Sequence, residues 1–201
     1  ALRARRGTFL AKLSTEVDSL IINLEEQGCQ VLLEQMHLQT PPGESLVQMT
    51  ALRVLQVTGS LKRWQQLEGP ISRLLQLLQP PALEELTLAG VDQLKIVRAL
   101  LSHPPLTSTL TRLKIGLHGF HFLAQEDLRA ISAPLEKLRS LSLFGADSNG
   151  CPSRDGFCRL FICADALLDY LGQIRNPDEI EMLHIANTGG ILGDDHQVAS
   201  L

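Results

Sequence analysis

The feature that most constrains the fold is a spacing of aliphatic residues, L-x-x-L-x-L, that recurs along the chain. Side chains of an extended segment alternate between faces, so the fourth and sixth positions point into a core while the third and fifth face outward. Clear copies begin at Leu52, Leu83, Leu110, Leu138 and Ile180, and Leu33, Met36 and Leu38 fit more loosely. These copies start 19, 31, 27, 28 and 42 residues apart. The pattern predicts short strands stacked side by side over a shared core.

Composition agrees with repeated, uniform packing layers. Forty of the 201 residues are leucine, whereas only eight are aromatic, and a chain of this length can bury a sizeable core as one domain. The net charge of -4 argues against a general affinity for nucleic acid or acidic membranes. No apolar run approaches the roughly 20 residues that cross a bilayer, so we expect a soluble protein. The four cysteines do not form a disulfide framework, and a cytoplasmic or nuclear location is expected.

The first 15 residues leave the location open. Arg3, Arg5, Arg6 and Lys12 precede the first acidic residue, Glu16, among scattered apolar residues. An organellar targeting segment can begin in this way; the alternatives are a basic helix end or a cut inside a longer protein.

The next segment is expected to be a capping helix. From Thr15 to Gln27 the apolar residues keep helical spacing, and Gly28 supplies a stop. The stretch from Leu13 to Leu24 also resembles the first helix of an F-box. A helix here would cover the exposed first layer of the stacked strands.

From residue 53 onward, strand and helix signals alternate. Strands are predicted over 53–59, 83–90, 110–116, 138–145 and 179–186. Helices are predicted over 67–78, 94–101, 125–132 and 161–174, several of them ended by proline. Residues 147–156 are a turn-rich insertion, and the residues after Thr188 are glycine-rich and polar.

The repeats resemble leucine-rich repeats of the ribonuclease-inhibitor-like and F-box-associated type over residues 31–190. The resemblance implies an α/β fold, a right-handed solenoid or horseshoe of about five to six units, with parallel strands on its concave face and helices on its convex face. Residues 1–30 would be the basic segment and capping helix, and 191–201 a flexible tail. The family usually places Asn or Cys three residues after the sixth template position. Here those positions hold Ser60, Val91, His118, Ala146 and Thr188. Glycine one residue earlier, at 59, 90 and 145, predicts a different turn.

If the strands stack, their outward positions form a candidate binding face. The predicted partner-binding residues are Gln56, Glu85, Thr87, Arg112, Lys114, Ser140, Ser142 and His184. The middle of this set is charged, acid beside base, which suits a protein or peptide partner whose orientation is fixed by charge. The alternative is that these side chains are only the solvated faces of strands.

Catalytic and metal signals are weak, and we expect no enzyme activity, no cofactor and no metal. Cys151, Cys158 and Cys163 lack C-x-x-C spacing, and His118-Gly-Phe-His121 lacks the glutamate of a zincin helix. Asp194-Asp195-His196 falls in the polar tail, where no preorganised site is expected. One Trp, one Tyr and no basic stripe argue against nucleic-acid binding.

Two functional hypotheses follow. In the first, the chain is a non-catalytic scaffold that binds a protein or peptide partner on its strand face, as the substrate-recognition part of an F-box-type ubiquitin ligase receptor or as an assembly subunit. In the second, it is the regulatory repeat region of a larger nucleotide-switch or enzymatic protein. An upstream F-box would support the first, and an upstream P-loop the second. An assembly subunit imported into an organelle is a third possibility, which rests on the basic N-terminus. The oligomeric state is left open.

Overall fold

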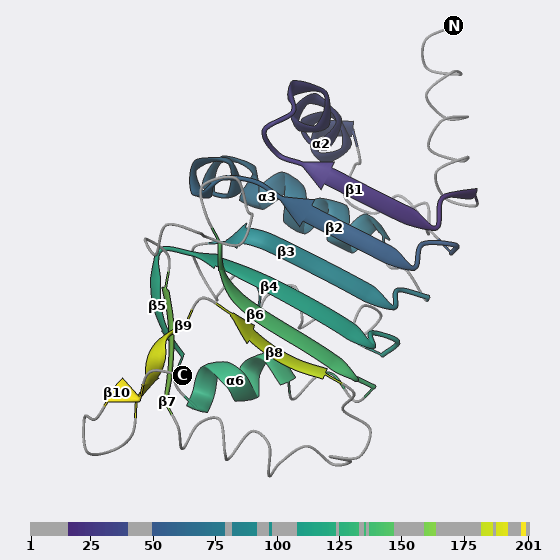
Figure 1. Cartoon of the computed structure of the whole chain (residues 1–201). Coiled ribbons are helices and arrows are strands. Elements are labelled where there is room, and N and C mark those ends of the chain that lie inside the picture. Colours follow the sequence, from purple (N-terminus) through teal and green to yellow (C-terminus); the bar gives the residue numbers. More distant parts are fainter. Residues whose placement is uncertain are drawn as a thin grey trace, which may run out of the picture.

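The protein is an α/β fold built on one parallel sheet (Figure 1). A computed structural model describes residues 16–39, 50–78, 82–91, 97, 108–123, 125–132, 135, 137–146, 159–163, 182–186, 188–192 and 198–199. Six strands form the main sheet, in the order β1 (Ser19–Asn23), β2 (Val54–Thr58), β3 (Glu85–Val91), β4 (Arg112–His118), β6 (Ser140–Ala146) and β8 (Met182–Ala186). All neighbouring pairs are parallel. The five strands predicted from residue 53 onward are therefore confirmed, and a sixth precedes them.

The register of the sheet aligns the template copies position by position. Leu55, Leu86, Leu113 and Leu141 pair in one row, and the sixth template positions pair in the next. Both rows are buried, as are the first template positions Leu52, Leu83, Leu110 and Leu138. All of these residues belong to one core. Since each fully buried aliphatic side chain is worth about 1.5–3 kcal/mol, this shared core is the main stabilising term.

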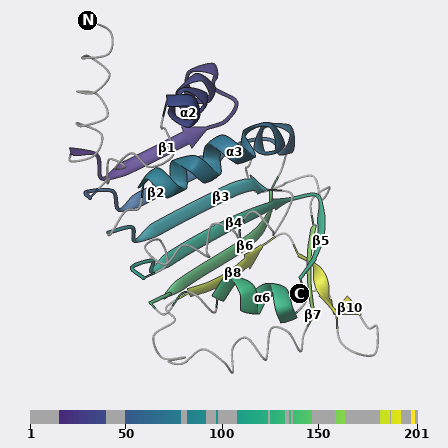
Figure 2. The same ribbon diagram turned by 180° about the vertical axis from the view of Figure 1, so that it is seen from behind.

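The described helices lie on one face of the main sheet or beside its first strand. Figure 2 shows α3 (Leu61–Leu78) and α6 (Gln125–Ser132) in front of the strands, and α2 (Gln27–Gln39) lies beyond β1. Trp64, Leu67 and Ile71 of α3 and Leu128 and Ile131 of α6 join the core. The helices predicted over 67–78 and 125–132 are confirmed, whereas the one predicted over 94–101 lies outside the described residues except for Val97.

The N-terminal prediction is wrong in two respects. Residues 19–23 form the first strand of the sheet and not a capping helix, so the resemblance to an F-box helix fails over these residues. Leu33, Met36 and Leu38, the loosest copy of the template, lie in helix α2, and Gly28 lies in its first turn. The true first copy is Val17, Leu20 and Ile22, with Leu20 and Ile22 paired to Leu55 and Val57. A separation of three residues suits a helix as well as the template, so spacing alone does not distinguish the two segments.

Glycine is required just after β2 and near the end of β3. Gly90 has a φ of 86° and sits at a register shift between β3 and β4. A Cβ atom at Gly90 would lie 1.7 Å from the carbonyl oxygen of Gly59, and one at Gly59 would lie 2.6 Å from Cβ of Leu24. Gly90 therefore packs against the Gly59 backbone and Gly59 against the Leu24 side chain, with no room for a side chain at either glycine.

A second sheet lies at the carboxyl ends of the main strands (Figures 1 and 2). Its order is β10 (Val198–Ala199), β9 (Thr188–Leu192), β7 (Arg159–Cys163) and β5 (Phe120–Leu123), with β10 antiparallel to β9 and the other pairs parallel. Residues 161–163 are therefore strand, where the start of a helix was expected. Strands β9 and β10 occupy part of the region assigned to a polar, flexible tail. The insertion at 147–156 lies outside the described residues.

Candidate functional site

The candidate site is the face of the main sheet opposite α3 and α6, which Figure 1 shows from the front. The register places its side chains in two rows that run across the strands. The first row is Ser19, Val54, Glu85, Arg112, Ser140 and Met182, and the second is Ile21, Gln56, Thr87, Lys114, Ser142 and His184. We call these two rows the outer face. All eight predicted partner-binding residues fall in these rows. Ile21 also lies in them, although a helix was predicted at its position.

A three-residue charge cluster occupies the middle of the outer face. Glu85 Oε2 lies 3.2 Å from Arg112 Nε, and Glu85 Oε1 accepts a hydrogen bond from Lys114 Nζ at 2.9 Å. The Glu85 side chain is only 16% exposed, whereas those of Arg112 and Lys114 are 51% and 40% exposed. One carboxylate thus lies beneath two cations, and the cluster presents an excess of one positive charge to solvent.

The other polar residues of the outer face differ in exposure: Ser19 and His184 are exposed and Gln56 is half-buried. Thr87, Ser140 and Ser142 are buried, and Ser142 Oγ lies 3.1 Å from His184 Nδ1 in a hydrogen bond whose direction depends on the imidazole tautomer. Within the described part of the chain, every buried side-chain nitrogen or oxygen has a hydrogen-bond partner. Because Ser142 is 6% exposed, its hydroxyl is better placed to hold His184 than to meet a substrate.

Apolar side chains stand at both ends of the outer face. Ile21 on β1 is 64% exposed and Met182 on β8 is 46% exposed. From β1 to β8, the outer face therefore presents one exposed apolar side chain, the charge cluster and a second exposed apolar side chain, with Ser19 and His184 exposed on the same edge strands.

The rim at the amino ends of the strands carries further charge. Arg53 and Glu84 form an exposed ion pair with Nη1 and Oε1 at 3.4 Å, and Arg139 is exposed at the start of β6. Arg53 N–H and Val54 N–H both donate to the Asp18 carbonyl, and Glu84 N–H donates to the Arg53 carbonyl. These backbone bonds extend the strand ladder by one residue and fix the rim relative to the outer face.

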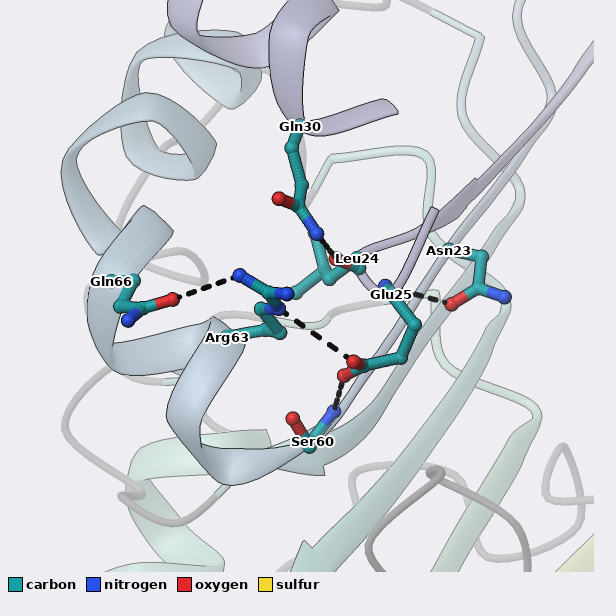
Figure 3. A network of polar contacts seen from close by, with 7 residues as sticks. All are labelled: Asn23, Leu24, Glu25, Gln30, Ser60, Arg63 and Gln66. Carbon is teal, nitrogen blue, oxygen red and sulfur yellow. Dashed lines mark hydrogen bonds and ion pairs between the residues drawn. The ribbon is translucent and has the colours of Figure 1, made fainter. Parts of the chain in front are cut away.

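A separate polar network joins β1 to helix α3 (Figure 3). The Ser60 N–H donates to Glu25 Oε1 at 2.8 Å, and Arg63 Nε lies 3.6 Å from Glu25 Oε2. Arg63 also donates to Gln66 Oε1, while Gln30 donates to the Leu24 carbonyl. The Ser60 side chain and then its backbone N–H lower the pKa of Glu25; desolvation opposes them less strongly, and the Arg63 charge lowers the pKa by a still smaller amount. The network caps the start of α3 and is a structural feature, distinct from the outer face.

The cysteine and histidine candidates do not converge in the described chain. His118 is the last residue of β4 and His121 lies in β5, so the expected strand-to-helix loop is instead a pair of strands. Cys163 lies in β7, and Cys151, Cys158, Asp194, Asp195 and His196 lie outside the described residues. Among the residues that the structure describes, there is no group of three or more His, Cys, Asp or Glu side chains that could hold a metal ion.

No protein-family model matches the chain, and no curated protein matches it. Among its described residues, no helix has the length and apolarity that a membrane span requires.

Proposed function

We propose that this chain is a divergent leucine-rich-repeat scaffold whose outer face binds a protein or peptide partner. The observation that supports it is the register: five copies of one leucine template, predicted from spacing alone, occupy equivalent positions in adjacent parallel strands. In this proposal the sheet is the concave side of a right-handed horseshoe and α3 and α6 belong to its convex side. The scaffold performs no chemistry itself.

The chemistry of the outer face supports recognition of a protein. Parallel strands display their outward side chains as a fixed array, so charged and apolar groups keep constant mutual positions. The Glu85, Arg112 and Lys114 cluster would set the orientation and register of a partner, since charges at an interface contribute more to specificity than to affinity. Ile21 and Met182 would supply apolar contact area, which charges alone do not provide.

The turns offer a physical reason for the divergence of the repeats. Near the end of β3, the Trp64 indole N–H and the Gly59 N–H donate to the Ala89 carbonyl, where the family would use an Asn or Cys side chain. In this proposal, the repeats keep the apolar template and change the turn. A role as the recognition part of a ubiquitin ligase receptor, or as an assembly subunit, stays a prediction. The resemblance to an F-box helix does not support it, because residues 19–23 form a strand.

The proposal is tested by photo-cross-linking from matched positions. A photo-reactive residue in place of Gln56 would stand on the outer face, and one in place of Gln65 would stand on the exposed side of α3. We expect partner adducts from position 56 and not from position 65, in extracts of the source organism.

Charge-reversal variants provide an independent test of the outer face as the binding surface. The Arg112→Glu/Lys114→Glu variant should lose the adduct, whereas Lys62→Glu/Arg129→Glu, which changes the net charge equally at exposed helix positions, should keep it. Identical partners from both variants and the wild type would refute the outer face as the binding surface.

A further inference from the structure

We infer that the partner of the outer face is an acidic peptide segment in extended conformation, with an apolar residue on each side of its acidic centre. This inference rests on the proposed function and specifies its ligand. It depends on three observations: the excess of cations at the centre, the apolar ends, and the fixed distance between them.

The centre of the outer face is more positive than the chain as a whole. The whole chain carries a net charge of -4, yet the centre of the outer face sets two cations against one carboxylate. The cations are the exposed members of the cluster, and Glu85 lies beneath them. A partner approaching β4 therefore meets guanidinium and ammonium groups first. Carboxylates on the partner complement them, since an Arg fork and a Lys ammonium both bind carboxylate oxygens well.

The apolar ends define the rest of the ligand. Ile21 and Met182 are the large hydrophobic residues that the outer face leaves exposed among its described side chains, and they stand on the two edge strands. Apolar side chains on the partner would cover them, and each would bury area worth about 25 cal/mol per Å² before the costs of association.

The strand order gives the distances between these side chains, and from them the spacing of residues in the peptide. Strands of a sheet lie about 4.8 Å apart, so Ile21 on β1 is roughly 14 Å from Lys114 on β4, and Arg112 is roughly 10 Å from Met182 on β8. An extended chain advances about 3.3 Å per residue. Side chains that share one face of an extended chain are an even number of residues apart. In a peptide that crosses the strands, the acidic centre would therefore follow one apolar anchor by about four residues and precede the other by about two to four.

Glu85 makes the inference testable in both directions. Its carboxylate occupies the same cations that a partner carboxylate would use. Removing the Glu85 charge with Glu85→Gln frees them, so the variant should bind an acidic peptide more tightly. Removing the cations with Arg112→Gln/Lys114→Met should have the opposite effect.

The experiment measures binding of fluorescein-labelled synthetic peptides to the full chain by anisotropy. The probe peptide has two leucines flanking a glutamate pair at the inferred spacing. A second peptide carries glutamine in place of glutamate, and a third has the same composition with both glutamates moved to one end. We expect the probe to bind at least tenfold more tightly than either control, with an affinity that falls as salt rises from about 0.05 to 0.3 M. Glu85→Gln should tighten it about threefold or more, and Arg112→Gln/Lys114→Met should weaken it about tenfold.

Several results would overturn the inference. If the glutamine peptide binds as tightly as the probe, acidic residues are not required. If the rearranged peptide binds as tightly as the probe, the spacing is not required. Tighter binding of a single-stranded RNA of similar length would point to another class of ligand. A concentration-dependent dimer in sedimentation that Arg112→Gln/Lys114→Met abolishes would assign the outer face to a second copy of the chain.

Thermal unfolding by circular dichroism must show that each variant remains folded. Lys62→Gln serves as the matched loss of an exposed cation, and its peptide binding should be unchanged.

Failure of the peptide and failure of the proposed function are distinguishable. If no acidic peptide binds but the photo-cross-link from position 56 still depends on Arg112 and Lys114, the outer face is a binding surface for a partner of other chemistry. If neither experiment gives a signal, both proposals fall.

Discussion

The indole N–H of Trp64 donates a hydrogen bond of 2.9 Å to the carbonyl oxygen of Ala89, and both groups are buried. The same carbonyl accepts the N–H of Gly59 at 3.2 Å. One tryptophan in the first turn of α3 thereby ties that helix to the end of strand β3.

Replacing Trp64 tests the importance of this bond. Trp64→Phe removes the donor and leaves a cavity, and we expect a loss of about 1–3 kcal/mol in the free energy of unfolding. Urea denaturation measures it. Lys62→Ala, two residues earlier in the same helix and exposed, is the control and should change stability by less than about 0.5 kcal/mol. Equal effects would mean that the Trp64 bond adds nothing beyond helix propensity.

Substitutions at Gly90 and Gly119 distinguish the effect of steric contact from that of backbone strain. Both have positive φ, 86° and 92°, but a Cβ at Gly90 would strike the Gly59 carbonyl, whereas one at Gly119 meets nothing within 4 Å. Gly119→Ala should cost about 1 kcal/mol from strain alone, and Gly90→Ala clearly more, because backbone must move. Gly28→Ala, in helix α2 with open space around it, should stabilise by about 0.5–1 kcal/mol. Thermal denaturation of the three variants checks this order, and equal losses at 90 and 119 would contradict the close approach.

Because the strands share one core, truncating a buried side chain in any of them should lower the free energy of unfolding strongly. Leu113 is fully buried in β4, so Leu113→Ala should destabilise the chain by about 2–5 kcal/mol. Val31 is 43% exposed on α2, and Val31→Ala should have little effect because alanine also favours a helix. Urea unfolding should show a single transition for wild type if β2, β3, β4 and β6 share one core. Two transitions, only one of them moved by Leu113→Ala, would argue for separate cores.

Glu25 gives a pH dependence whose sign follows from its pKa. The pKa of Glu25 is lowered on folding from an ordinary value of 4.5, chiefly by the Ser60 side chain and backbone and also by the Arg63 charge. Its ionised form therefore stabilises the folded chain above pH 4.5, and this stabilisation is lost as pH falls through the lowered pKa. The carboxylate is partly exposed, so we expect at most about 1 kcal/mol. Glu25→Gln should be less stable than wild type at pH 7, and the difference should shrink in the acid range. A difference that grew below pH 4.5 would contradict the sign of the shift.

Much of the main sheet was predictable because its chemistry is local. Each of the strands β2, β3, β4, β6 and β8 carries its own leucine template, so spacing predicted both the strands and the paired rows Leu55, Leu86, Leu113 and Leu141. The outward residues followed from the same alternation. The coarse α/β arrangement, with one parallel sheet, thus needed no long-range information.

The errors arose where local patterns are ambiguous or where distant contacts decide. Val17, Leu20, Ile21 and Leu24 suit a helix on spacing alone, and only pairing with β2 makes residues 19–23 a strand. The second sheet pairs β5 with β7, segments about 40 residues apart, and neither carries the template. At the candidate site, spacing predicted that Glu85, Arg112 and Lys114 would be neighbours, but not that the carboxylate would lie beneath the cations.

The contact between Gly59 and Gly90 has a practical consequence for anyone wishing to lengthen the molecule. Residues 60–90 run from one of these glycines to the next, and the strands before them are paired in register. A duplicated copy of this segment would bring its own glycine to the new junction. Extra modules could then be spliced in tandem without redesigning the loop that joins them.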